Sequence, residues 1–378
     1  PRPVAVLRPA CVRTIEEKSM AVPPPPPAMW VPQQEGVSQI LQLLTEYRQP
    51  GANQQQMYQR LQQCAQIPDF NNYLAFLLTQ GEGTQEEIRQ TAGLLLKNNL
   101  KTGWTTTAPE FRAYIQRALL PGLGHPSRFL RHTVGTTVSI IAKAAGPGGW
   151  PELYPALVQC IESNDVNHTD GALDAVYKVC EELNGRLDQA VPGMPEGSPA
   201  GLLIPRLLTL MAHPTPGVRR QALGSINLMV PSWPQSHAAA MDTYLQGLFA
   251  LAHDADNGVR KQVCAGIVAL LYRAPEKLVP NMREVITYMI ERTADGDEDV
   301  ALESCEFWAA FCEADLERDT VEVLREFTPK LIPMLLTNMA YADDDEEVIA
   351  AEDDEENQGQ EDREQDIRPS FRGQKDKG

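Results

Sequence analysis

A recurring set of three residues spaced four apart, most of them apolar and here called a comb, constrains the fold of this chain more than any other feature. Its clearest copy follows the turn-forming segment 213–217 (His-Pro-Thr-Pro-Gly), where Val218, Ala222 and Ile226 lie four residues apart. That spacing places the three side chains on one side of a helix. The same comb recurs at Ile88/Ala92/Leu96, Leu130/Val134/Val138, His168/Ala172/Val176, Val259/Val263/Ile267 and Val300/Ser304/Trp308. The chain therefore repeats one helical unit.

The spacing of the combs identifies the kind of repeat. Their first residues are separated by 42, 38, 50, 41 and 41 residues, and the long interval contains a Pro- and Gly-rich linker at 191–201. A helix-pair period of about 40–47 residues is the mark of HEAT and armadillo arrays. One pair cannot bury its own apolar face, so neighbouring pairs must stack. The sequence predicts an all-α fold, a HEAT-repeat α-solenoid in which antiparallel helix pairs form a right-handed superhelical array.

The pattern divides the chain into three regions. Residues 1–32 contain the run Pro23–Pro27 and no core-forming pattern, so we expect a disordered leader in which Met20 and Met29 are candidate natural starts. Residues 33–340 are expected to hold HEAT repeats 1 to 7 and the first helix of repeat 8, with that helix beginning near Phe327. Residues 341–378 are expected to be a disordered acidic loop, cut within a longer protein.

The charge of the chain restricts its partners. The formal net charge is −18, and residues 341–378 carry 15 Asp and Glu against 5 Lys and Arg. Nucleic acids and anionic membranes favour clustered basic residues, so neither is expected as a partner. No apolar run reaches the roughly 18 residues needed to cross a bilayer. A partner with a basic surface is the natural complement.

Motifs that carry chemistry are missing from the sequence. It has no phosphate-binding Gly-x-x-x-x-Gly-Lys-Ser/Thr, no Gly-x-Ser-x-Gly and no His-Glu-x-x-His. The best metal candidate, 295–299 (Asp-Gly-Asp-Glu-Asp), has Val300 where a calcium loop needs glycine, so its acids are expected to cap a helix instead. We therefore predict a protein that is not an enzyme and has no metal or cofactor.

Polar residues also recur with the repeat. An arginine follows the first residue of four combs, at Arg89, Arg131, Arg219 and Arg260. These residues predict a ladder of partly buried ion pairs between neighbouring turns. His213 and His253 occupy comparable positions before successive combs, which favours a role in the turns over a ligand set.

Specific segments resemble the beta-karyopherins, a family of nuclear transport receptors. Residues 68–74 (Pro-Asp-Phe-Asn-Asn-Tyr-Leu) followed by 92–99 (Ala-Gly-Leu-Leu-Leu-Lys-Asn-Asn) are similar to the N-terminal domain of that family, here 33–100. Four further segments resemble the transportin group of the family: 150–153 (Trp-Pro-Glu-Leu), 300–308, 329–333 (Pro-Lys-Leu-Ile-Pro) and 365–369 (Gln-Asp-Ile-Arg-Pro). The resemblance extends over roughly residues 30–372.

This resemblance implies a monomeric nuclear import receptor that shuttles between cytoplasm and nucleus. The N-terminal arch, to which this chain would correspond, binds the GTPase Ran in its GTP form. Cargo with proline–tyrosine nuclear localisation signals binds mainly to a C-terminal arch that this chain lacks, and phenylalanine–glycine nucleoporins are further partners. A HEAT-repeat scaffold subunit of a phosphatase or another complex is the alternative interpretation.

The resemblance also implies site residues. Ran lies on the concave surface, at positions that correspond to Lys97, Asn98 and Asn99, and Asp299 and Glu303 face a basic patch on Ran. An acidic loop couples Ran binding to cargo release, and it corresponds to Asp343, Asp344, Asp345, Glu346, Glu347, Glu352, Asp353, Asp354, Glu355 and Glu356.

Overall fold

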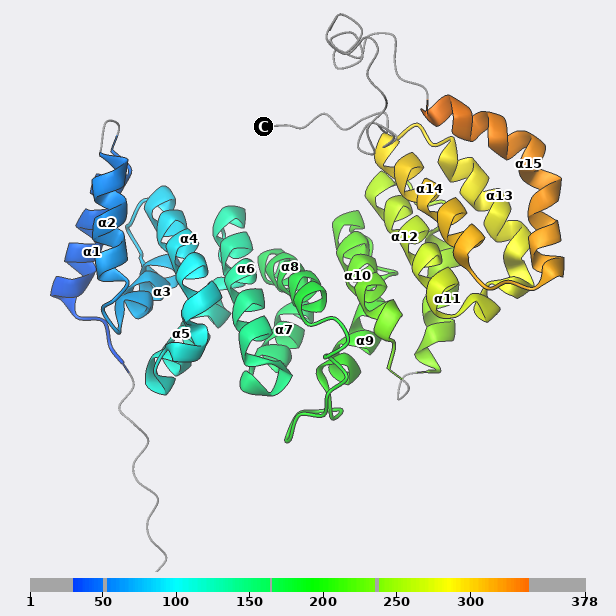
Figure 1. The fold of residues 1–378 in the computed structure, drawn as a ribbon. Helices are drawn as coiled ribbons and strands as arrows, with labels where there is room; N and C mark the ends of the chain where they lie inside the picture. The colour runs from blue at the N-terminus through cyan, green and yellow to red at the C-terminus, as the bar shows by residue number, and fades with distance from the viewer. Residues whose placement is uncertain (1–29, 50–52, 164, 235–237, 340–378) are drawn as a thin grey trace, which may run out of the picture.

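The computed structural model of the chain describes residues 30–49, 53–163, 165–234 and 238–339. In these ranges the regular structure consists of fifteen α-helices and short 3₁₀ turns, without a strand. Successive helices pair, and the pairs stack side by side into an arch (Figure 1). The predicted all-α HEAT-repeat solenoid is confirmed. The predicted leader up to residue 29 and the acidic loop lie outside the described residues.

The helices form two layers, because most helices pack against their partner in the pair and against a helix of the same layer in a neighbouring pair. The first pair is α1 (Gln34–Tyr47) and α2 (Gln54–Cys64). The outer layer continues with α3 (Phe70–Gln80), α5 (Pro109–Gly122), α7 (Leu153–Ile161), α9 (Pro199–Leu210), α11 (Ala240–Leu251), α13 (Met282–Thr293) and α15 (Arg318–Met339). The inner layer consists of α4 (Glu86–Gly103), α6 (Arg128–Ala145), α8 (Val166–Glu182), α10 (Pro216–Met229), α12 (Asn257–Arg273) and α14 (Glu298–Glu313). Short 3₁₀ turns join some of them at Trp104–Thr106, Pro147–Gly149, Val230–Ser232, Pro275–Lys277 and Val279–Asn281.

The apolar comb forms the core between the layers. In α6, Leu130, Val134 and Val138 are almost completely buried. Burying a side chain of this size contributes about 1.5–3 kcal/mol. The helix begins where the Ser127 hydroxyl accepts a hydrogen bond from the backbone N–H of Leu130, and it ends at Gly146, whose φ of 74° interrupts helical geometry. The comb recurs on the other inner helices, with His168 of α8 and Val218 of α10 only half-buried, so a continuous apolar core runs through the stack.

The last helix differs from the prediction. The sequence predicts a start near Phe327, but α15 begins nine residues earlier, at Arg318, and contains Pro329 and Pro333. Near its middle it packs against α13: Arg283 pairs with Glu326 at 2.8 Å, and the guanidinium lies 5.8 Å from the centre of the Phe327 ring. The helix therefore starts about two turns before the apolar stripe from which its start was predicted.

The linker within the array is also more ordered than its composition indicates. It runs from 183 to 198, between α8 and α9. The backbone N–H of Val191 donates to the carbonyl oxygen of Gly197 at 2.9 Å, and Leu187, Val191 and Met194 are buried. Gly197 has φ of 80°, a value that glycine adopts without strain. The segment is a closed loop with a small core of its own.

Candidate partner-binding surface

The inner helices from α4 to α14 line the concave side of the arch, and the outer helices form its convex side (Figure 1). Each inner helix buries its comb against the outer layer and leaves its opposite face to solvent. Solenoids bind their partners on such extended concave surfaces. This inner surface is the candidate site.

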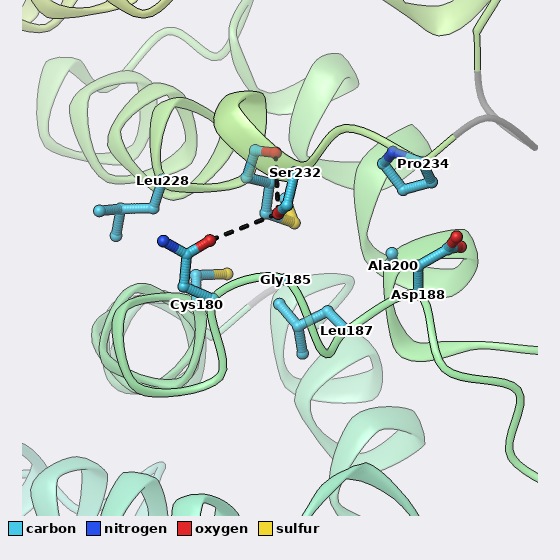
Figure 2. A pocket seen from close by; sticks show the side chains of 10 residues that line it. Cys180, Gly185, Leu187, Asp188, Ala200, Leu228, Ser232 and Pro234 are labelled. Carbon is cyan, nitrogen blue, oxygen red and sulfur yellow. Dashed lines mark hydrogen bonds between the residues drawn. The ribbon is translucent and has the colours of Figure 1, made fainter. Parts of the chain in front are cut away.

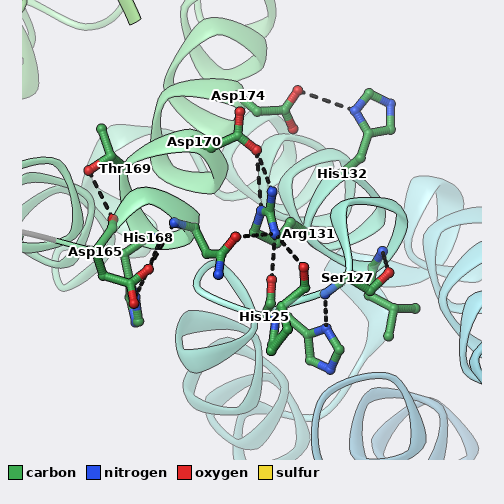
Figure 3. Close-up of polar contacts among 12 residues, drawn as sticks. His125, Ser127, Arg131, His132, Asp165, His168, Thr169, Asp170 and Asp174 are labelled. Atoms are coloured by element: carbon green, nitrogen blue, oxygen red, sulfur yellow. Dashed lines mark hydrogen bonds and ion pairs between the residues drawn. The ribbon is translucent and has the colours of Figure 1, made fainter. Parts of the chain in front are cut away.

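One edge of the surface is built by arginine side chains in the turns, of which Arg131 is the best connected (Figure 3). Its Nη1 donates to the carbonyl oxygens of His125 and Pro126 in its own turn, at 2.7 and 2.9 Å. The same nitrogen donates to Asn167 Oδ1 at 3.0 Å, and Nη2 donates to Asp170 Oδ2 at 2.7 Å. Because Asn167 and Asp170 belong to α8, this arginine joins two successive repeats.

The same contact recurs farther along the array. Arg219 pairs with Asp254 at 2.8 Å, and Arg260 pairs with Asp295 at 3.0 Å. Each of these arginines also donates to two carbonyl oxygens of its own turn. Arg89 differs, because it donates to a backbone carbonyl of α3 at 2.8 Å and forms no ion pair with a described acid. The predicted ladder is confirmed at Arg131, Arg219 and Arg260, and wrong at Arg89.

The carboxylates of this ladder are held in their charged form. Burial by itself would raise the pKa of Asp254 and of Asp295. Hydrogen bonds from Arg219 to Asp254 and from Arg260 to Asp295, together with a backbone N–H at each carboxylate, outweigh burial and lower both pKa values. The edge of the surface is therefore a row of fixed ion pairs.

The turn residues singled out from the sequence have structural roles. The Asp297 carboxylate accepts the backbone N–H of Val300 at 3.2 Å, so the capping interpretation of 295–299 is confirmed. His213 Nδ1 accepts the N–H of Thr215 at 3.1 Å, which confirms its turn role. His253 is exposed, and its ring packs edge-on against Tyr288.

A second polar contact joins α6 and α8 (Figure 3). His132 Nδ1 lies 3.2 Å from Asp174 Oδ1, and Lys178 Nζ donates to Asp174 Oδ2 at 2.6 Å and to the carbonyl oxygen of His132 at 3.1 Å. Burial lowers the pKa of Lys178, although the Asp174 carboxylate opposes this effect. The three groups satisfy one another, so the cluster stabilises the packing of the two helices.

The predicted basic and amide residues lie in the second half of α4. Asn98 is exposed and Lys97 is half-buried. The side-chain amide of Asn99 donates to Asn71 Oδ1 of α3 at 2.8 Å, so this residue also joins the two helices of its own repeat. Lys97 and Asn98 are the freer members of the group.

The predicted acidic residues lie near the start of α14. Asp299 is exposed, with Lys261 of α12 at 3.5 Å, and Glu303 follows one helical turn later. Burial raises the pKa of Glu303; the charge of Lys261 opposes this effect, whereas the carboxylates of Glu306 and Asp299 add to it. A cation brought to this patch would favour the ionised form of Glu303.

The two predicted groups do not meet. The α4 group and the α14 group lie on inner helices near opposite ends of the described arch (Figure 1). A partner that contacts both must span the concave surface. The acidic-loop residues at 343–347 and 352–356 lie outside the described residues.

Several exposed apolar residues on the inner helices were not anticipated. Leu94 of α4 is 45% exposed, Phe129 of α6 is 66% exposed and Val166 of α8 is 81% exposed. Each lies outside the comb positions, and an apolar residue out of phase with a helical stripe is the signal that could have identified it. These three residues are candidate contacts of a partner.

The part of the chain described by the structure contains cavities of very different size. A cavity of about 10 Å³, enough for one water molecule, lies between the end of α8 and the end of α10 (Figure 2). A larger hollow of about 360 Å³ lies between α1, α2 and the start of α3, lined by Ile40, Arg60 and Phe70 among others. The described residues contain no group of three or more His, Cys, Asp or Glu that could hold a metal ion. None of the described helices has the length and apolarity to cross a membrane.

Comparison with known proteins places this surface in a family. Residues 58–125 match the model of the importin-beta N-terminal domain. Transportin-1 of Oryza sativa subsp. japonica is 44% identical over 344 residues, which are 91% of this chain and 38% of that protein. Transportin-1 of Mus musculus is 38% identical over 343 residues, which are 90% of this chain and 37% of that protein. The chain thus spans little more than a third of the length of these relatives.

Solved structures show the same architecture. Kap121p bound to RanGTP matches with a TM-score of 0.63 at 17% identity, over 89% of this chain and 31% of that chain. The Kap95:Nup1 complex matches with a TM-score of 0.63 at 17% identity, over 82% of this chain and 39% of that chain. At sequence identities this low, the similarity to the solved structures shows the fold alone. The relatives found by sequence show which group of the family this chain resembles. The chain belongs to the importin-beta family, and it matches the N-terminal portion of the transportins within that family.

Proposed function

We propose that this chain provides the Ran-binding N-terminal arch of a nuclear import receptor that shuttles between cytoplasm and nucleus and has no catalytic activity. The observation that carries the proposal is the uninterrupted inner surface from α4 to α14, with a basic and amide group at one end and an acidic group at the other. A neighbour of the same fold has been solved bound to RanGTP. A concave wall of this length suits a folded domain better than a short peptide.

Each group has a distinct role in the proposal. Lys97 and Asn98 supply hydrogen-bond donors at the α4 end, and Asn99 orients the end of that helix through its contact with Asn71. Asp299 and Glu303 attract a basic patch on Ran at the α14 end. When the partner binds over Glu303, it brings a positive charge to a carboxylate whose ionised form is disfavoured by burial. The ion pair therefore forms in a poorly solvated environment.

Release of cargo follows from coupling along the array. Each repeat contacts only its neighbours, so small rotations add up to a change of curvature. Two ligands that prefer different curvatures weaken each other's binding, and the effect is reciprocal. In the proposal, the acidic residues at 343–347 and 352–356 link Ran binding to release of cargo with proline–tyrosine nuclear localisation signals. Phenylalanine–glycine nucleoporins complete the set of partners, by analogy with the neighbour solved with Nup1.

The proposal is tested by measuring the affinity of the chain for Ran loaded with GTP or GDP by isothermal titration calorimetry. We expect strong preference for the GTP form. The variants Lys97→Ala/Asn98→Ala and Asp299→Asn/Glu303→Gln should each weaken binding by about 10-fold, which corresponds to about 1.4 kcal/mol of lost contact energy.

Matched controls lie on the convex side. Lys330→Ala on α15 and Glu284→Gln on α13 change exposed charges of the same kind outside the inner surface, and binding should stay at the wild-type level. Equal affinity for both nucleotide forms, or no binding, would contradict the proposal and favour the alternative of a HEAT-repeat scaffold.

A further inference from the structure

The inner helices are linked to one another at their turn ends, with one exception. The Ser127 hydroxyl donates to Glu86 at 2.6 Å and links α6 to α4, and Arg131 links α6 to α8. Arg219 of α10 donates to Asp254 in the turn before α12, and Arg260 of α12 donates to Asp295 in the turn before α14. These two contacts link α10 to α12 and α12 to α14. Between α8 and α10, whose residues are all described, no side-chain hydrogen bond or ion pair joins the two helices. The fourth and fifth repeats therefore meet without a link on this edge.

The register of the repeat explains the exception. Each ladder arginine lies four residues after the N-cap of its helix, and in the two later links the acid lies two residues before the N-cap of the next inner helix. In α8 the arginine position is occupied by Thr169, and before α10 the acid position is occupied by His213. Thr169 Oγ1 donates to the carbonyl oxygen of Asp165 at 3.1 Å, and His213 Nδ1 accepts the N–H of Thr215. Both side chains are satisfied within their own repeat.

The opposite ends of the same two helices meet around a cavity. The small cavity shown in Figure 2 lies there, between residues such as Cys180 and Leu228. A hydrogen bond of 3.3 Å lies beside it, from the Ser232 hydroxyl to Asn184 Oδ1. At the next junction, by contrast, an asparagine side chain of α10 donates to a backbone carbonyl of α12 at 2.8 Å. Polar contacts hold α10 to α12 more firmly than to α8.

The convex side of this junction is connected. Arg206 of α9 donates to Glu162, at the end of α7, at 3.2 Å and to Glu196 of the connecting loop at 3.0 Å. The loop itself, residues 183–198, is the longest connection between helices in the described chain. A joint with polar contacts on its convex side, and none between the described helices at the turn edge of its concave side, bends most easily about the convex side.

We propose that the junction between α7–α8 and α9–α10 is the hinge of this arch, with the Arg206–Glu162 contact as its pivot. The helices from α3 to α8 move as one body and those from α9 to α14 as another, and bending widens or narrows the concave surface. Hinges are local positions that absorb the motion of two packed bodies. The inference does not depend on which partner binds.

The hinge is tested by installing the missing link. Thr169→Arg combined with His213→Asp gives the junction the residues that Arg219 and Asp254 supply one repeat later, and aspartate keeps the turn contact as Asp254 does. Single-molecule energy transfer is measured between dyes on genetically encoded azides at Lys101 of α4 and Arg273 of α12, both exposed. The wild-type chain should show a broad distribution of energy-transfer efficiency. In the Thr169→Arg/His213→Asp variant we expect this distribution to narrow to the width measured for a reference dye pair on α4 and α8, at Lys101 and Glu181.

Two further variants complete the test. Thr169→Arg alone supplies charge without a partner, and we expect no narrowing. Arg219→Thr combined with Asp254→His gives the α10–α12 junction the residues of the proposed hinge. The distribution of energy-transfer efficiency between Lys101 and Arg273 should then broaden further, while circular dichroism still shows full helix content. The proposal is overturned if the wild-type width across α8 and α10 equals that of the reference pair. It is overturned as well if the folded Thr169→Arg/His213→Asp variant keeps the wild-type width.

Discussion

At the scale of single residues, the ion pairs of the turns combine low exposure with full charge. The side chains of Asp254 and Asp295 are each 7% exposed, and those of Arg219 and Arg260 are 14% and 16% exposed. A charge removed from water is costly unless a partner and further hydrogen bonds compensate it. Here each guanidinium is shared between a carboxylate of the next repeat and carbonyls of its own turn. Removing one partner leaves the other charge poorly solvated.

We therefore expect Asp295→Asn to lower the stability of the chain by about 2–3 kcal/mol, since Arg260 loses its carboxylate and Arg292 loses the nearer of its two carboxylates. Urea denaturation followed by circular dichroism at pH 7 measures the change. The control is Asp242→Asn, which removes a pair with Lys277 in which the carboxylate is 60% exposed, and it should cost less than about 1 kcal/mol. Equal losses for the two variants would show that burial of the ladder contributes nothing.

The ladder also makes a prediction for pH. The pKa of Asp295 in the folded chain is lowered below the ordinary value of about 3.9, so its stabilising contribution is complete above that value. The contribution is lost as the pH falls through the lowered folded pKa. The stability difference between wild type and Asp295→Asn should therefore stay constant from about pH 6 to 8 and shrink below about pH 4. A difference that grows on acidification would contradict this sign.

At the scale of elements, the inner helices pack closely where small residues allow it. Gly171 of α8 lies against the end of α5, and a Cβ added to it would stand 2.0 Å from the carbonyl oxygen of Leu123 and 3.0 Å from Arg131 Cδ. The first contact is with backbone, which cannot move aside as a flexible side chain does. The approach of α8 to α6 and to the turn before it thus depends on a residue without a side chain.

Gly171→Ala should accordingly destabilise the chain by about 3 kcal/mol, because the clash forces the two repeats apart. The matched control is Gly217→Ala in the first turn of α10, where an added Cβ meets nothing within 4 Å. That variant should be neutral or more stable by up to about 1 kcal/mol, since alanine favours the helix. Thermal unfolding by circular dichroism compares them, and similar melting temperatures for both would refute the packing argument.

At the scale of the whole molecule, charge and shape act together. The chain carries a net charge of −18 and presents a long curved surface with its predicted acidic group near one end. The summed field of an acidic protein accelerates encounter with a basic partner and is screened by salt over about 8–10 Å at physiological ionic strength. Short-range contacts on the surface then determine how long the complex lasts.

For the proposed complex with Ran-GTP, we expect the association rate to fall by about 10-fold or more between 50 and 500 mM salt, with a much smaller change in the dissociation rate. Stopped-flow fluorescence at several salt concentrations measures both rates. Asp299→Asn/Glu303→Gln should reduce the salt dependence of association, whereas Glu284→Gln on the convex side should change it less. A salt effect confined to dissociation would argue against electrostatic steering.

The sequence by itself determined the repeat and its secondary structure. Residues that recur at helical spacing, such as Leu130, Val134 and Val138, must share one helix face, and a period near forty residues requires that successive faces stack. The recurring arginine likewise predicted ion pairs in the turns. These features depend on spacing along one segment, so they could be read without coordinates.

Only the tertiary structure decided which residues meet across repeats. Arg219 finds its acid 35 residues farther along the chain, whereas the arginine position of α8 is occupied by Thr169, whose hydroxyl donates to a carbonyl oxygen of its own turn. The sequence aligned His213 with His253, but the structural counterpart of His213 is Asp254, one residue later. The placement of Lys97 and Asp299 near opposite ends of one concave wall likewise follows from the stacking of six inner helices. Such contacts depend on small rotations that accumulate between neighbouring pairs, and no local pattern encodes their sum.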